Sequence, residues 1–122
     1  MHLINAEIEN SEIHSRVKAL EIQEGVESIV EREMNLKLDK DSYSYYRFTM
    51  HIRYLIQRLM SGTQSETGSG SMVKMLANDY PKTYICAKKI AAFLQKQENW
   101  CCNDEELLYL MLHINRVCQK NT

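Results

Sequence analysis

The stretch that decides the fold is NDEELLYLMLHINRVCQ, residues 103–119. Asn103 can cap the first turn of a helix, with Glu106 three residues later in a capping-box arrangement. The apolar residues recur at the three-and-four spacing that places side chains on one side of a helix: Leu107, Leu110, Met111, Ile114, Val117 and Cys118. The spacing therefore predicts a helix with one buried face.

A polar stripe follows the other side of this predicted helix. It consists of Glu106, Tyr109, His113, Arg116 and Lys120. The histidine of this helix thus stands between a tyrosine and an arginine, and we expect it to point away from the hydrophobic core.

A second stretch, residues 42–60, repeats the arrangement. Its apolar face is an unbroken three-and-four series over nearly four turns: Tyr45, Phe48, Ile52, Leu55 and Leu59. The opposite stripe contains Arg47, His51, Tyr54 and Arg58. Two predicted helices therefore each carry a histidine with a tyrosine and an arginine nearby.

The rest of the chain predicts further helices. We expect one at about 11–35, capped by Asn10 or Ser11, a short one at 72–78 and a long one at 81–97. The first has Val17, Leu20, Ile29, Val30 and Met34 as its apolar surface. Gly25 should weaken it by about 1 kcal/mol relative to alanine, and His14 is expected to be solvated. Residues 61–70 have the composition of a loop. Four long helices and one short one predict an all-α bundle.

Composition limits the classes of function. A length of 122 residues predicts one domain, and the net charge of −1 gives no global attraction to nucleic acid or a membrane surface. Apolar runs are short, and the first residues lack the features of a signal peptide, which predicts a cytoplasmic protein without membrane insertion. The four cysteines lack a C-x-x-C spacing and predict reduced, mostly packed thiols.

The two histidine stripes suggest phosphoryl acceptance. Histidine is the usual acceptor from another phosphohistidine, because neutral imidazole is nucleophilic near pH 7. Arg47 and Arg58 flank His51, and Arg116 follows His113 by one turn. Such arginines would disfavour imidazolium and then bind the oxygens of the attached phosphate. The added charge could bias which helices or subunits associate.

Spacing alone leaves other interpretations open. The histidines could be merely solvated, or they could bind a metal together with Glu105 or Glu106. A small enzyme using cysteine or histidine is a further alternative. The chain has no H-x-x-x-H or H-E-x-x-H pair and no nucleophile elbow, so neither a metal site nor hydrolytic chemistry is indicated. No cofactor is expected.

Three stretches in order resemble the PTS regulation domain, the module of BglG-type transcriptional antiterminators and related sugar-operon activators. They are YYRFTMHIRYLIQRL at 45–59, YPKTYICAKKIAAFL at 80–94 and DEELLYLMLHINRV at 104–117. The resemblance covers about 11–119. It implies a five-helix bundle that forms a homodimer and is phosphorylated on histidine by the sugar phosphotransferase system, through HPr or a sugar-specific enzyme IIB.

The resemblance also assigns roles to residues. The first phosphoacceptor of the family falls on His51 and the second on His113, while Arg58, Asn115 and Arg116 match positions commonly polar or basic beside them. Residues 1–10 look like the end of a preceding module of the same kind, with His2 at its second histidine. Residues 11–122 would then be the second regulation domain of a longer regulator.

Two departures from the family pattern bear on function. Met50 stands before His51, where such proteins often have a small or acidic residue, and the N-terminal RNA-binding domain of the antiterminators is absent from this sequence. We therefore expect a regulatory module that is a substrate for phosphorylation rather than an enzyme, without direct nucleic-acid contact. Its phosphorylation would control dimerisation and an attached RNA- or DNA-binding domain. The alternative is a purely structural dimerisation bundle.

Overall fold

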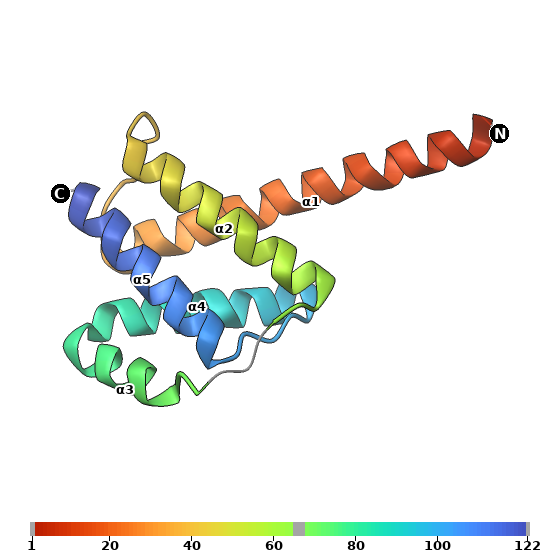
Figure 1. The fold of residues 1–122 in the computed structure, drawn as a ribbon. Helices are drawn as coiled ribbons and strands as arrows, with labels where there is room; N and C mark the ends of the chain where they lie inside the picture. The colour runs from red at the N-terminus through yellow and green to blue at the C-terminus, as the bar shows by residue number, and fades with distance from the viewer. Residues whose placement is uncertain (1, 65–67, 122) are drawn as a thin grey trace.

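The computed structural model describes residues 2–64 and 68–121, with side chains described for 12–64 and 68–119 (Figure 1). Within these residues the regular structure is entirely helical, as the sequence predicts. The five helices are α1 His2–Met34, α2 Tyr43–Ser61, α3 Gly70–Asp79, α4 Pro81–Glu98 and α5 Asp104–Asn121. Residues 65–67 of the expected loop, together with the side chains of His2 and Lys120, lie outside the described part.

Helix α1 differs from the prediction at its N-terminus. The expected start near residue 11 is wrong, because α1 runs unbroken from His2, and its first half projects beyond the other helices (Figure 1). Among the side chains of α1 that are described, from residue 12 on, the buried core positions begin at Ile22, whereas Val17 and Leu20 are about half exposed, at 47% and 49%. The helix ends before Asn35, whose φ of 54° is left-handed.

Side-chain caps fix the start of α2 and α5. The backbone N–H of Tyr45 donates to Ser42 Oγ over 3.1 Å, and that of Glu106 donates to Asn103 Oδ1 over 3.0 Å. The cap at Asn103 agrees with the sequence-based prediction. The carboxylate of Glu106, expected to complete a capping box, instead binds Arg58 of α2. A helix-terminal residue thus joins two helices.

The core lies where α5 packs against α2, α3 and α4, and α1 packs against α2 and α4. The predicted apolar faces of α2 and α5 are confirmed, since their central residues are buried: Phe48, Ile52, Leu55, Leu59, Leu107, Leu110, Met111, Ile114 and Val117. Because α2 and α5 pack directly on each other, the polar stripes beside these faces are brought together. The fold thereby positions the two histidines.

Gly25 lies at a close approach between α1 and α4. A Cβ atom built at this position would lie 2.3 Å from Cζ of Phe93, too close for contact without movement of the ring. Gly25→Ala should therefore lower the free energy of unfolding by about 1 kcal/mol. Without the Phe93 ring, replacing glycine by alanine within a helix would raise it by about the same amount. Urea unfolding measures this difference.

A second background tests the reason for this loss. In Phe93→Leu the ring atoms nearest to Gly25 are gone, so adding Gly25→Ala to that variant should stabilise it. A destabilising effect of equal size in both backgrounds would contradict the role assigned to Phe93.

Candidate functional site

His51 of α2 and His113 of α5 form a stacked pair. Their ring centroids are 3.8 Å apart, and the ring planes make an angle of 19°. Both side chains are partly buried at the edge of the core. This position agrees with the prediction that the two imidazoles point away from the hydrophobic core. Their stacking within one chain could not be read from the sequence.

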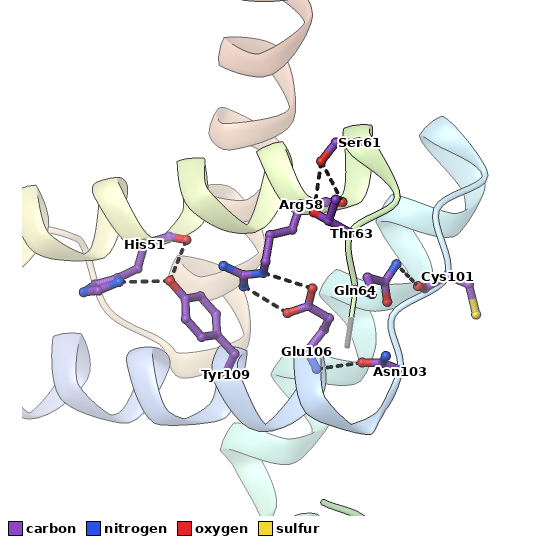
Figure 2. A network of polar contacts seen from close by, with 9 residues as sticks. All are labelled: His51, Arg58, Ser61, Thr63, Gln64, Cys101, Asn103, Glu106 and Tyr109. Carbon is purple, nitrogen blue, oxygen red and sulfur yellow. Dashed lines mark hydrogen bonds and ion pairs between the residues drawn. The ribbon is translucent and has the colours of Figure 1, made fainter. Parts of the chain in front are cut away.

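Tyr109 of α5 joins the pair through its hydroxyl group. Its Oη lies 2.9 Å from Nδ1 of His51 and donates to the backbone carbonyl of His51 over 3.2 Å (Figure 2). Its ring centroid is 4.5 Å from that of His113, at an interplanar angle of 64°. The sequence places Tyr109 on the stripe one turn before His113 but gives it no role. The structure makes it the link between both histidines.

Arg58 lies on the far side of Tyr109 from His51 (Figure 2). Its Nη2 and Nε donate to the two carboxylate oxygens of Glu106 over 2.9 and 3.3 Å. The guanidinium carbon stands 4.4 Å from the Tyr109 ring centroid, in cation–π geometry. Arg58 is therefore paired with the Glu106 carboxylate and also packs against the Tyr109 ring.

Arg47 and Arg116 line an open hollow beside His113. The hollow has a volume of about 220 Å³ and is also bordered by Tyr43 and Ser44. Both arginines are exposed, and the guanidinium carbon of Arg47 stands 5.9 Å from the Tyr43 ring centroid. An anionic group attached to His113 could reach this hollow without entering the core.

Asn115, expected beside the phosphate, does not join this cluster. Its Oδ1 accepts a hydrogen bond from Thr83 of α4 over 2.5 Å, and its side chain borders a different hollow, formed with α4 and Met34. The geometry does not support a phosphate-binding role for Asn115. The residue instead connects α5 to α4.

Both histidines are held in the neutral form. Burial lowers the pKa of His113 to about 4, with further contributions from His51 and the arginines at 116, 47 and 58. The pKa of His51 is also lowered, first by burial and then by the same three arginines. Neutral imidazoles at neutral pH have a free electron pair on one ring nitrogen. The site thus contains two potential nucleophiles.

Acidification should destabilise the fold through these histidines. The pKa of His113 is about 4 in the fold against an ordinary value of 6.5, so the unfolded chain binds more protons between these values. Stability is therefore lost as the pH falls from about 6.5 toward about 4. Because His113 is only half-buried, solvent screens part of this effect, and we expect a loss of about 1 kcal/mol at pH 5.

Urea unfolding at about pH 7.5 and pH 5 tests this expectation against the wild type. His113→Asn should reduce the difference between the two pH values, whereas His14→Asn, at an exposed position of α1, should leave it unchanged. The same pH dependence in both variants would contradict the assignment to His113.

Three of the four cysteines offer little nucleophilic chemistry, and the fourth, Cys101, is exposed. Burial raises the pKa of Cys86 and Cys102 to about 12 and that of Cys118 to about 11. Their thiolates are therefore scarcely populated at neutral pH. Among the described residues, no group of three or more histidine, cysteine, aspartate or glutamate side chains is placed to hold a metal ion. No described helix is both long and apolar enough to cross a membrane.

Known proteins resemble most of this chain. It is 30% identical to the transcription antiterminator LicT of Bacillus subtilis (strain 168) over 120 residues, which is 98% of this chain and 43% of LicT. It is 28% identical to the beta-glucoside operon antiterminator of Dickeya chrysanthemi over 117 residues, 96% of this chain and 41% of that protein. The GlcA/glcB genes antiterminator of Staphylococcus carnosus (strain TM300) is 38% identical over 95 residues, 76% of this chain and 32% of that protein.

The chain spans less than half the length of each of these relatives. A family model described as the PRD domain matches residues 24–117, which include all of α2 to α4, both stacked histidines and Tyr109. The chain therefore belongs to the PRD domain family.

Proposed function

We propose that this chain is the regulatory module of a bacterial sugar-operon transcriptional regulator, and that His51 and His113 accept phosphoryl groups from the phosphotransferase system. The observation that carries the proposal is the stacked pair of imidazoles at 3.8 Å, with lowered pKa values and an arginine-lined hollow beside it. The three relatives named above are antiterminators, which supports a role in transcriptional control.

The chemistry of the pair suits acceptance rather than catalysis. Each neutral imidazole can attack the phosphorus of a phosphohistidine donor, and the attached group adds nearly two negative charges at the α2–α5 contact. Arg47 and Arg116 line the hollow beside His113 and would bind these charges, and Arg58 could exchange its bond with Glu106 for one with phosphate. Phosphorylation would thereby alter the packing of α2 on α5.

The proposed consequence is a change in self-association. Two copies would form a homodimer whose state controls an attached RNA- or DNA-binding domain, and HPr or a sugar-specific enzyme IIB would supply the phosphoryl group. The division between residues 1–10, as the end of a preceding module, and 11–122 remains part of the proposal, although it falls within α1. Sedimentation equilibrium of phosphorylated and unphosphorylated protein measures the change in association.

Phosphoryl acceptance is tested by incubation with phosphoenolpyruvate, enzyme I and HPr, with and without an enzyme IIB. Intact mass spectrometry should find acid-labile phosphoryl groups on the wild type, fewer on His51→Ala and on His113→Ala, and none on the double variant. His14→Ala is the matched control at an exposed histidine and should behave as the wild type. An unchanged mass with every donor would favour a purely structural dimerisation bundle.

A further inference from the structure

The Tyr109 hydroxyl makes two contacts with the same residue of α2. Its Oη donates to the His51 carbonyl over 3.2 Å and lies 2.9 Å from Nδ1 of the His51 ring. A phenol has one proton, and burial raises the pKa of Tyr109 above its ordinary value, so the proton is present at neutral pH. Since that proton is donated to the His51 carbonyl, Oη can only accept in its contact with Nδ1, so Nδ1 must carry a hydrogen.

The opposite assignment is less favourable. A hydroxyl that donated to Nδ1 would turn an oxygen lone pair toward the carbonyl oxygen of His51 at 3.2 Å, where two acceptors would face each other. The arrangement with Nδ1–H satisfies both contacts with one donor each. It leaves the electron pair of the ring on Nε2, on the opposite side of the imidazole from Tyr109 (Figure 2).

We infer that Tyr109 is a positioning residue that holds His51 in the Nδ1–H tautomer, so that Nε2 is the atom that accepts the phosphoryl group. The part concerning phosphoryl transfer rests on the proposed function, whereas the tautomer does not. The stacking with His113 covers a face of the His51 ring. Attack by Nε2 occurs in the plane of the ring, so the stacked partner does not obstruct it.

The step balances without proton transfer. The electron pair of Nε2 forms a bond to the phosphorus of a phosphohistidine on the donor protein, and the nitrogen–phosphorus bond of the donor breaks. The donor imidazole leaves with the electron pair of that bond. The proton on Nδ1 of His51 remains in place and donates to Tyr109 Oη in the product, where the ring carries positive charge and this hydrogen bond is strengthened.

The tautomer is measured on the whole unphosphorylated chain by ¹⁵N NMR of the histidine rings at about pH 8. We expect the Nδ1–H tautomer of His51 in the wild type and a shift toward Nε2–H in Tyr109→Phe, which loses only the hydroxyl group. Tyr54→Phe is the matched control, because the Tyr54 ring also neighbours His51, at a centroid distance of 6.1 Å. Nε2–H in the wild type, or an unchanged tautomer in Tyr109→Phe, would overturn the inference.

The reacting atom is measured after transfer from phosphorylated HPr or enzyme IIB. Trypsin separates His51 in residues 48–53 from His113 in residues 97–116, and isomer-specific antibodies at alkaline pH identify the phosphorylated nitrogen. The wild type and Tyr54→Phe should give the Nε2 isomer at His51. Tyr109→Phe should form it about three- to tenfold more slowly, the effect of one lost hydrogen bond.

The two measurements separate the inference from the proposed function. If no donor phosphorylates His51 but the tautomer depends on Tyr109 as expected, the proposed function fails and the positioning role stands. If His51 is phosphorylated on Nδ1, or equally fast in Tyr109→Phe, the positioning role is overturned while the proposed function stands.

Discussion

Glu106→Ala is expected to destabilise the fold by about 3 kcal/mol, the largest loss among the substitutions considered. The Glu106 side chain is only 4% exposed, and its two oxygens accept the two hydrogen bonds from Arg58. Removing the carboxylate leaves a guanidinium group beside the core without its counter-charge. Arg58 is 32% exposed and can turn partly toward solvent, which keeps the loss at the lower end of the usual range for breaking a buried pair.

Urea unfolding of a double-mutant cycle measures this loss. Arg58→Leu alone should also be strongly destabilising, because it leaves the Glu106 carboxylate buried without a partner. The double variant Arg58→Leu with Glu106→Ala should be more stable than the sum of the single losses predicts, by at least about 1 kcal/mol. Additive losses would contradict a direct interaction between the two side chains.

The exposed pair between Lys89 and Glu33 provides a matched control. Their charged atoms lie 2.8 Å apart, close to the distance in the Arg58–Glu106 pair, but the Lys89 side chain is 52% exposed. Removal of this pair by Lys89→Ala should lower the free energy of unfolding by less than about 1 kcal/mol. The comparison separates the effect of burial from that of charge pairing.

The buried faces of α2 and α5 could be predicted because helical periodicity is a local property of the sequence. The spacing of Ile52 and Leu55, or of Leu110 and Ile114, needs no knowledge of the partner helix. The start of α1 could not be predicted as well. Asn10 resembles a cap, but cap residues also occur within helices, and no glycine or proline interrupts residues 2–11.

The contacts of the site depend on distances between helices, which the sequence does not contain. Residues 51 and 109 are 58 positions apart, and the function of the Tyr109 hydroxyl follows only from its contact with Nδ1. The family resemblance assigns Asn115 to a position beside the phosphoacceptor His113. Two residues along a helix are about 200° apart around its axis, so Asn115 faces α4 instead.

The effect of Gly25 on stability also depends on a contact between helices that the sequence does not show. Its intrinsic cost in a helix could be stated from the sequence alone, and taken alone it favours replacement by alanine. The structure reverses this expectation, because the ring of Phe93 from α4 occupies the space where a Cβ atom would lie. The residue that makes the glycine necessary lies 68 positions further along the chain (93 minus 25).

Replacing Arg47 and Arg116 together by glutamine should slow phosphoryl transfer to His113 about 30-fold. Both arginines line the hollow beside His113, where the transferred group would lie. Each exposed charge-assisted contact is expected to contribute about 1 kcal/mol, and two such contacts amount to a factor on the order of 30. Arg53→Gln is the matched control, because Arg53 is an exposed arginine of α2 that binds Gln23 of α1.

The pH of the assay separates the two effects of these arginines. They also lower the pKa of both histidines, so their removal raises the protonated fraction of imidazole in mildly acidic solution. At about pH 8 both rings are neutral with or without them, and the lost rate reports contacts with the phosphoryl group. Initial rates with phosphorylated donor should fall further at about pH 5, close to the His113 pKa of about 4, and rates equal to those of Arg53→Gln at both pH values would contradict any role of the hollow in binding phosphate.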